Sequence, residues 1–455
     1  MVEHLINRFE SGQSTLKNRV LKASPPAILT SGYLVLIIFG TSILKLPLST
    51  TRSVTWLETL FTSASAVTLT GLGVADIGAR YTVFGQTVIA LLIQAGGLGF
   101  MTFSVLTVLS IGKRIGVRHQ MLALEAFNET SLNKIREVAR AVVYFALAVE
   151  SIGFVLLALT WSGELGWRLA LYHAFFYTVS AFNNAGLALS ADNLMPYASD
   201  VPVNLIISSL FIIGGLGFVV LQDLWQTRRR WKRLQPYTKL ILGATVIINL
   251  GAWLLVWLFE RNNAATIANL PLAGQLTASW FQAVTPRTAG FNTLPIESLT
   301  DPTTLLIIVL MFIGGGSMST AGGIKLGTFV VMFMTTYAFL GRSDDVTMMR
   351  RSVQRNVVMK AFSVSVISMT LVIIGTMALS ALEGAPLLDS LFEVVSALST
   401  AGLSRGLTGE LSTAGRCLIM ILMFVGRLGP LTAAYVIATP KKRRVRYPSV
   451  DIQVG

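Results

Sequence analysis

The sequence predicts an all-α polytopic membrane protein, and three observations support this prediction. The chain of 455 residues is 53% hydrophobic and only 13% charged, whereas a soluble protein carries about a quarter charged residues. A short motif that ends in glycine occurs four times, and long and short apolar runs alternate along the chain. Together they predict eight spanning helices and four re-entrant segments, arranged as four helix–pore loop–helix repeats around a central pore.

The glycine motif recurs at intervals of roughly 100–115 residues, which is too long for a solenoid. Its copies are FTSASAVTLTGLG at 61–73, FYTVSAFNNAGL at 176–187, WFQAVTPRTAGF at 280–291 and FEVVSALSTAGL at 392–403. When they are aligned on Gly71, Gly186, Gly290 and Gly402, an aromatic residue falls ten positions earlier in every copy. This pattern is typical of four domain-sized units around one axis.

The apolar runs have two lengths. A spanning helix needs about 20 apolar residues, whereas runs of about 10–14 are typical of re-entrant segments. The expected long runs are 27–47, 82–110, 139–161, 202–225, 240–259, 303–340, 361–382 and 417–438, and the short runs are 55–69, 169–183, 272–285 and 387–398. The predicted divisions are a tail at 1–26, repeats at 27–137, 138–237, 238–356 and 357–440, and a basic tail at 441–455.

The net charge of +14 comes largely from basic stretches before, between and after the repeats. These stretches are the N-terminal tail and residues 111–140, 228–239, 342–360 and 441–446. Basic loops mark the cytoplasmic side, so both termini are expected there and the glycine motifs face outside. We interpret the basic runs as topogenic signals, with membrane lipid as a secondary ligand and no nucleic acid as partner.

Several function classes are disfavoured by what the sequence lacks. The single cysteine, Cys417, and the three histidines form no disulfide framework and no metal-ligand spacing. No cleavable signal peptide is recognisable at the N-terminus. A His-Glu-x-x-His motif and paired intramembrane aspartates are both missing, so we expect no enzyme and no covalently bound cofactor.

The glycine motifs suit an ion filter made of backbone carbonyls, which replace the hydration shell of a cation. Glycine adopts the backbone conformations that such a filter needs. The side chains three positions before the glycines differ, which favours backbone over side-chain recognition, and the C-terminal ends of the short helices favour a cation. For a single glycine, helix packing is the alternative. The predicted filter residues are Leu69, Thr70, Gly71, Asn184, Ala185, Gly186, Thr288, Ala289, Gly290, Thr400, Ala401 and Gly402.

The third inner run contains GGGSMSTAGGIK at 314–325. Glycine costs about 1 kcal/mol relative to alanine inside a helix, so this stretch is expected to break the helix in the membrane. Close packing through small residues is the alternative. The residues assigned to this segment, called the gate loop below, are Gly314, Gly315, Gly316, Ser317, Thr320, Gly322, Gly323 and Lys325. Arg427 lies mid-span in the last run, and a charge there is a functional candidate, whereas Lys325 is close enough to an end to snorkel.

With these motifs, nearly the whole chain resembles the Trk/Ktr/HKT superfamily of potassium transporters, and in length it is most similar to the KtrB membrane subunits of bacterial Ktr systems. The resemblance implies K⁺ as the substrate and as the only metal ion, bound at the filter. It also implies potassium selectivity, because Gly71 stands where some plant relatives that carry sodium have serine. The glycine-rich loop would be a gate below the filter, and Arg427 matches the arginine that lies near it in the family.

The same resemblance implies the surroundings of the protein. It predicts a homodimer in the bacterial cytoplasmic (inner) membrane, stimulation by Na⁺, and a cytosolic ring of KtrA-type regulators that bind adenine nucleotides. No nucleotide fold is recognisable in this chain, so nucleotide sensing would belong to the partner. A secondary transporter of another small solute is the alternative function, although such folds usually show inverted or paired repeats.

Overall fold

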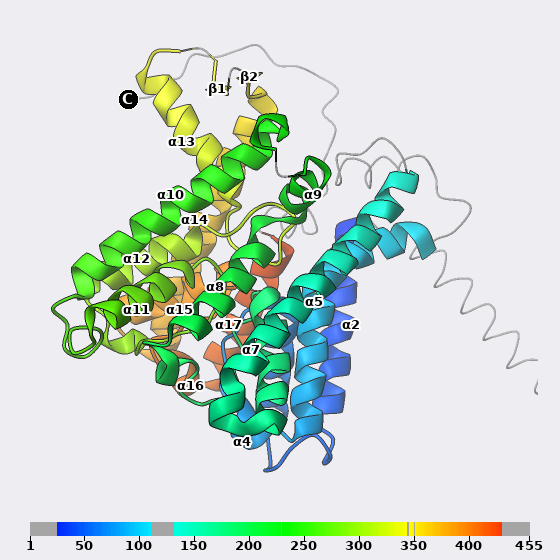
Figure 1. Ribbon diagram of the computed structural model, residues 1–455, viewed down its shortest axis with the longest axis vertical. Coiled ribbons are helices and arrows are strands. Elements are labelled where there is room, and N and C mark those ends of the chain that lie inside the picture. Colours follow the sequence, from blue (N-terminus) through cyan, green and yellow to red (C-terminus); the bar gives the residue numbers. More distant parts are fainter. Residues whose placement is uncertain (1–24, 111–131, 229, 344, 350, 430–455) are drawn as a thin grey trace, which may run out of the picture.

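The structure is a computed structural model, which describes residues 25–110, 132–228, 230–343, 345–349 and 351–429. Helices form nearly all of the regular structure in these ranges (Figure 1), and the predicted all-α fold is confirmed. The sheet found in the described chain is a hairpin of β1 (Thr347–Met348) and β2 (Arg351–Ser352).

The order of the helices is consistent with an outer helix, a short helix and an inner helix in each predicted repeat, with the outer and short helices of the second repeat both within α7. The first repeat contains α2 (Pro25–Leu44), α3 (Trp56–Thr68), α4 (Ile77–Arg80) and α5 (Val83–Ser110). The second contains α7 (Leu132–Phe182), η1 (Met195–Tyr197), α8 (Val201–Leu216), α9 (Phe218–Gln226) and η2 (Trp231–Arg233). The third contains α10 (Pro236–Glu260), α11 (Leu272–Val284), η3 (Ile296–Ser298), α12 (Asp301–Phe312) and α13 (Leu326–Leu340). The fourth contains α14 (Arg355–Glu383), α15 (Leu387–Ser399), α16 (Leu407–Glu410) and α17 (Thr413–Leu428).

Packing between the repeats runs in one direction around the molecule. The inner helix of each repeat contacts the helix that carries the short segment of the next: α5 contacts α7, α8 contacts α11, α12 contacts α15 and α17 contacts α3. The last contact joins the fourth repeat to the first and closes the arrangement. In Figure 1, α2 and α5 lie on one side, α10 and α12 lie on the other, and α17 lies between them. The short helices are thereby directed toward a common centre.

Local signals fix where several of these helices begin. Thr55 and Glu58 form a capping box at the start of α3, in which the Glu58 amide donates to Thr55 Oγ1 at 3.2 Å and the Thr55 amide donates to the Glu58 carboxylate at 2.8 Å. Asp200 caps α8 and Ser412 caps α17 with side-chain oxygens in the same way. Such caps satisfy amides that have no partner within the helix.

The predicted division between the outer and short helices of the second repeat is present as a kink. The runs 139–161 and 169–183 suggested two helices with a linker, and α7 (Leu132–Phe182) consists of two helices that meet at a kink between these runs. Its non-helical residue is Gly166, with φ of 71°. Glycine adopts this conformation without steric cost, so one residue redirects the chain and no linker is needed. The stretch of α7 after Gly166 is the short helix of the second repeat.

The prediction of a continuous inner run at 202–225 is wrong. It is divided at Gly217, which has φ of 93°, into α8 and α9, and these helices are bent by 94°. The sequence suggested a break in the third inner run alone. The second inner run is broken as well, because the loop of the third repeat occupies the bend.

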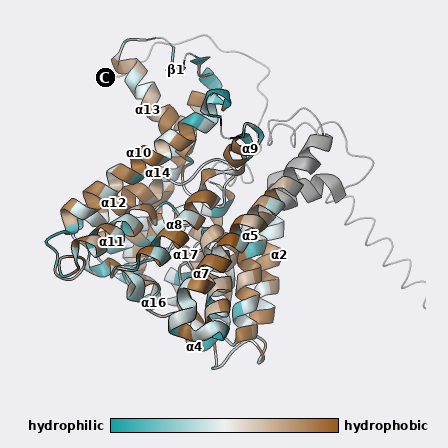
Figure 2. Ribbon diagram, viewed as in Figure 1, coloured by the Kyte–Doolittle hydropathy of each residue, from teal (hydrophilic) through white to brown (hydrophobic). Residues whose placement is uncertain are grey.

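By length and composition, three helical stretches of the described chain could cross a membrane, Ala141–Phe182, Pro236–Glu260 and Arg355–Glu383, and α8 with α9 would add a fourth. Shorter apolar helical stretches occur in α2, α5, α12 and α13, so the count of eight spans and the repeat boundaries stay predictions. Figure 2 shows apolar residues along the helices and hydrophilic residues around β1. Exposed apolar side chains suited to lipid contact follow α14 at helical spacing: Phe362, Val366, Met369, Ile373 and Met377.

Parts of the prediction lie outside the described residues. These parts are most of the tail 1–26, the basic loop 111–131, the end of the last run after residue 429, and the tail 441–455.

Candidate functional site

Three of the short helices end in the same turn. Leu69, Asn184 and Thr400 have left-handed backbones, with φ of 57°, 56° and 49°. In each repeat the next amide donates to the carbonyl five residues back: Thr70 to Ser65 at 2.9 Å, Ala185 to Ser180 at 2.8 Å and Ala401 to Ser396 at 2.8 Å. This is the hydrogen-bond pattern of a Schellman turn. Because a non-glycine residue is disfavoured in this conformation by about 1–2 kcal/mol, the repeats share a strained ending.

The third repeat reaches a similar conformation by another route. Its motif contains Pro286 and Arg287 after the end of α11. The amide of Ala289 donates to the carbonyl of Thr285 at 2.9 Å, and Thr288 is the left-handed residue, with φ of 75°. The TPRTAG segment therefore ends its helix with a different turn, but like the other repeats it has a left-handed residue two positions before its glycine.

The four predicted glycines form a closed ring. Gly71, Gly186, Gly290 and Gly402 have φ of 91°, 66°, 79° and 82°. An ideal Cβ added to Gly71 would lie 3.3 Å from the Cα atoms of both Gly186 and Gly402, and one added to Gly290 would lie 2.9 Å from Gly186 Cα and 3.4 Å from Gly402 Cα. The ring therefore follows chain order, and a side chain at any of these positions would crowd it.

Carbonyl oxygens lie beside this ring. The added Cβ of Gly71 would be 2.6 Å from the carbonyl oxygen of Ala185, and that of Gly290 would be 3.0 Å from the carbonyl oxygen of Ala401. The structure thus brings the predicted filter residues of all four repeats together at the ends of the short helices. Their binding of an ion stays a prediction.

The predicted break in the third inner run is present. Helix α12 ends at Phe312 and α13 begins at Leu326, so close packing of one continuous helix is excluded. The base of the intervening gate loop is closed by backbone bonds: Gly314 donates to Ile324 at 2.9 Å, and Leu326 donates to Gly315 at 2.8 Å. The gate loop is therefore a defined turn of chain, and its role as a gate stays a prediction.

The gate loop fills the bend between α8 and α9. The amide of Gly316 donates to the carbonyl of Gly215 at 2.8 Å, and the amide of Phe218 donates to the carbonyl of Met318 at 3.1 Å. An added Cβ at Gly217 would lie 3.5 Å from the carbonyl carbon of Gly316. The backbone groups freed by the bend in the second repeat thus find partners in the third.

The gate loop also touches two of the filter segments. Thr320 Oγ1 donates to Asn184 Oδ1 at 2.9 Å. An added Cβ at Gly322 would lie 2.5 Å from the carbonyl oxygen of Ser399. The loop therefore lies directly against the ends of the second and fourth short helices.

Arg427 is the side chain that ties the gate loop to the first and fourth repeats. It is 9% exposed, and it donates to the carbonyl of Thr320 at 2.6 Å, to the carbonyl of Gly96 at 3.0 Å and to Tyr33 Oη at 3.2 Å. The predicted proximity of Arg427 to the loop is therefore observed. Sequence reasoning missed Tyr33, whose only signal was that it is the single tyrosine in the apolar run 27–47.

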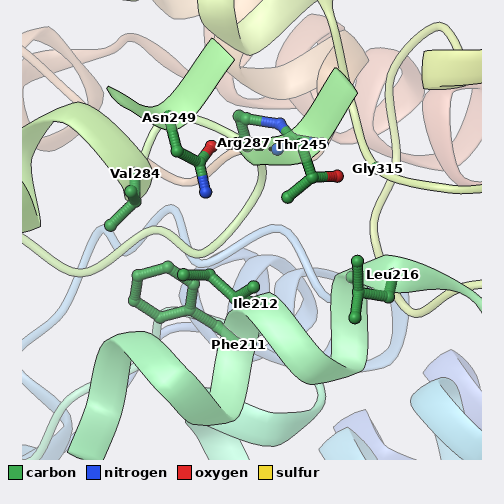
Figure 3. Close-up of a pocket in the computed structure, with 9 residues that line it drawn as sticks. Phe211, Ile212, Leu216, Thr245, Asn249, Val284, Arg287 and Gly315 are labelled. Atoms are coloured by element: carbon green, nitrogen blue, oxygen red, sulfur yellow. Dashed lines mark hydrogen bonds between the residues drawn. The ribbon is translucent and has the colours of Figure 1, made fainter. Parts of the chain in front are cut away.

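Arg287 is a second buried cation, for which no role was predicted. It follows the end of α11 and lines a pocket with Thr245 and Asn249 of α10 and Gly315 of the gate loop (Figure 3). Its guanidinium donates to Asn249 Oδ1 at 3.0 Å and to the carbonyl of Gly314 at 3.5 Å. The filter segment of the third repeat is thereby connected to the start of the loop.

Lys325 lies at the other end of the loop, at the N-cap of α13. Its ammonium group donates to the carbonyl of Ala321 at 2.6 Å. In this structure the side chain therefore folds back onto its own loop.

The helices and the converging segments at their ends define a membrane transport protein of the pore-loop type. Residues 28–447 match the TrkH family, described as cation transport protein, and the chain belongs to this family. It is 45% identical over 442 residues to "Ktr system potassium uptake protein B" of Bacillus subtilis, and the aligned region covers 96% of this chain and 99% of that protein.

Two further comparisons agree with this assignment. The chain is 31% identical over 450 residues to "Potassium/sodium uptake protein NtpJ" of Enterococcus hirae, covering 97% of this chain and 99% of the relative. The crystal structure of the potassium transporter TrkH from Vibrio parahaemolyticus has the same fold, with a TM-score of 0.71 and 19% identity, over 90% of this chain and 85% of that one.

Proposed function

We propose that this chain is the ion-conducting membrane subunit of a Ktr-type potassium uptake system. The observation that carries the proposal is the ring of Gly71, Gly186, Gly290 and Gly402, in which each glycine lies beside a backbone carbonyl of a neighbouring repeat. Carbonyl oxygens can replace the hydration shell of K⁺, and the negative ends of four helices favour a cation. The names of the relatives, which refer to potassium uptake and to potassium and sodium uptake, support this substrate.

The gate loop supplies the proposed regulation of this path. It lies against the filter segments through Thr320 and Gly322, and Arg427 holds it through one short hydrogen bond. Only Thr320 and Arg427 supply side-chain hydrogen bonds between the loop and other repeats in the described chain, and glycine-rich backbone has several accessible conformations. In the proposal this loop closes the path at rest and moves aside when the protein is activated.

The wider assembly is also proposed. Both termini and the basic loops lie in the cytoplasm, and the filter faces outside across a bacterial cytoplasmic membrane. Two copies form a homodimer on a cytosolic, KtrA-type ring that binds adenine nucleotides, and Na⁺ stimulates transport. The relative named for both potassium and sodium supports the link to Na⁺, and the name "Ktr system" implies a component besides the membrane subunit.

The test is ion flux in proteoliposomes that contain only this protein. K⁺, Na⁺ and Rb⁺ gradients are imposed separately, and K⁺ flux is measured with and without Na⁺. We expect K⁺ and Rb⁺ to pass and Na⁺ alone to pass poorly. Absence of K⁺ flux from a folded preparation, with uptake of an organic solute instead, would refute the proposal in favour of a secondary transporter.

A further inference from the structure

Glu150 is a buried carboxylate behind the filter segment of the second repeat, and it takes no part in the glycine ring or the gate loop. It lies in the outer part of α7 and is 7% exposed. An ionisable group inside an apolar span is a functional candidate by default. Its hydrogen bonds in the described chain come from amides: Gln94 Nε2 donates to Oε1 at 3.0 Å and to Oε2 at 3.1 Å, and Asn183 Nδ2 donates to Oε1 at 3.2 Å.

The three side chains form a closed triangle, because Asn183 Nδ2 also donates to Gln94 Oε1 at 2.7 Å. Gln94 belongs to α5 of the first repeat, whereas Asn183 follows the end of α7 and directly precedes the left-handed Asn184. Asn183 is fully buried, and a Cβ added to Gly97 would lie 2.7 Å from its Cγ atom. The side chain is thus fixed by the triangle on one side and by α5 on the other.

The corresponding positions of the other repeats make different contacts. Thr68 bonds locally to the carbonyl of Ala64 at 2.7 Å and to Thr70 Oγ1 at 2.8 Å. Arg287 bonds to groups of its own repeat, Asn249 and Gly314. Asn183 also donates locally, to the carbonyl of Val179 at 2.9 Å, but in addition it bonds to Glu150 of its own repeat and reaches Gln94 of the preceding repeat. The backbone ring has four similar segments, but the second is held from behind by a carboxylate.

We propose that Glu150 is a positioning residue for the filter. By accepting from Gln94 and Asn183 it fixes the chain at 184–186 relative to the first repeat, and so sets how well the carbonyls of that segment fit K⁺. This inference deepens the proposed function and rests on it. A small displacement would weaken the binding of K⁺ and reduce the preference over Na⁺, because each ion needs its own arrangement of carbonyls.

The test compares three variants: Glu150→Leu, Glu150→Gln, and a double variant, called the exchange, that combines Gln94→Glu with Glu150→Gln. For each variant the KM for K⁺, the K⁺/Na⁺ preference, the maximal rate and the melting temperature are measured. Glu150→Leu removes the carboxylate acceptor of the part-buried Gln94 amide and one of the three acceptors of Asn183 Nδ2, and the loss of such a bond corresponds to about a tenfold change in an equilibrium. We expect about that rise in the KM and a lower preference. Glu150→Gln should give intermediate values. The exchange restores one carboxylate and two amides, so it should return the KM and the preference to within about twofold of the wild-type values.

Glu260 provides a matched control. It is fully buried at the end of α10, and it accepts from the Thr300 amide at 2.9 Å and from Asn263 Nδ2 at 2.8 Å, both in loops away from the ring. Glu260→Leu should lower the melting temperature and leave the KM and the preference unchanged.

A folded Glu150→Leu protein with wild-type KM and preference overturns the inference. Equal effects of the Glu150 and Glu260 substitutions on the KM, or an exchange that fails to restore it, overturn it too. K⁺ binding is measured separately as the K⁺-dependent rise in melting temperature of the detergent-solubilised protein. A wild-type protein without K⁺ flux refutes the proposed function, and this melting shift still decides the role of Glu150.

Discussion

Arg427→Ala is expected to release the gate loop and raise K⁺ flux. The substitution removes three hydrogen bonds, of which only the one to the carbonyl of Thr320, at 2.6 Å, reaches the loop. A hydrogen bond to a charged group contributes about 1.5–3 kcal/mol, which corresponds to about a 10- to 150-fold change in an equilibrium. If the loop is open about 1% of the time, the open fraction rises at least about tenfold and then saturates.

The assay is initial Rb⁺ uptake by proteoliposomes, normalised to folded protein, with oligomeric state and melting temperature measured on the same preparations. Tyr33→Phe is the control, because Tyr33 Oη contacts Arg427 and the carbonyl of Gly96 but has no bond to the loop. We expect flux within about twofold of wild type for this variant, since one neutral hydrogen bond contributes only about 1 kcal/mol and the bond to Thr320 remains. Wild-type flux through a folded Arg427→Ala protein would refute the reasoning, as would an equal rise in Tyr33→Phe.

Three further predictions follow from the same geometry. Gly290→Ser should lower the K⁺/Na⁺ preference and the stability, because φ of 79° disfavours serine and the ring has no room for Cβ; competitive uptake measurements check this, and unchanged preference would remove Gly290 from the filter. In a background lacking Cys417, a cysteine at the exposed Glu297 should react with an impermeant reagent added outside, whereas one at the exposed Ser343 should not, and reversed labelling would overturn the orientation. Deleting several residues of 314–323 should raise flux in a protein that still folds, and a folded deletion variant with unchanged or lower flux would contradict the gate.

The parts of the fold that depend on local chemistry could be predicted from the sequence. The capping box at Thr55 and Glu58 fixes the start of α3, and the repeated glycine fixes where each short helix gives way to the ring. The gate loop could be predicted because its glycines make a helix unfavourable whatever surrounds it. In each of these places the cause lies within a few residues of the effect.

The bend at Gly217 could not be predicted in the same way. The GGLGF sequence at 214–218 is compatible with a continuous helix, because the same five residues at 96–100 lie inside α5. The bend exists because Met318 and Gly316 supply partners for backbone groups near Gly217, and these residues come from another repeat. The contacts of Arg427 with Tyr33 and Gly96, and of Asn183 with Gln94, were hidden for the same reason, because packing between repeats determines them.

A ring made by one chain differs from a ring made by four identical chains, because each repeat can carry a side chain that the others lack. The backbone turns at Leu69, Asn184, Thr288 and Thr400 are nearly equivalent, which ion coordination by carbonyls requires. Behind them the contacts diverge: Asn183 is held by a carboxylate, whereas Arg287 reaches the gate loop. Substitutions behind the ring should therefore have effects that depend on the repeat, whereas substitutions of the ring glycines should resemble one another. That contrast separates residues that line the path from residues that position it.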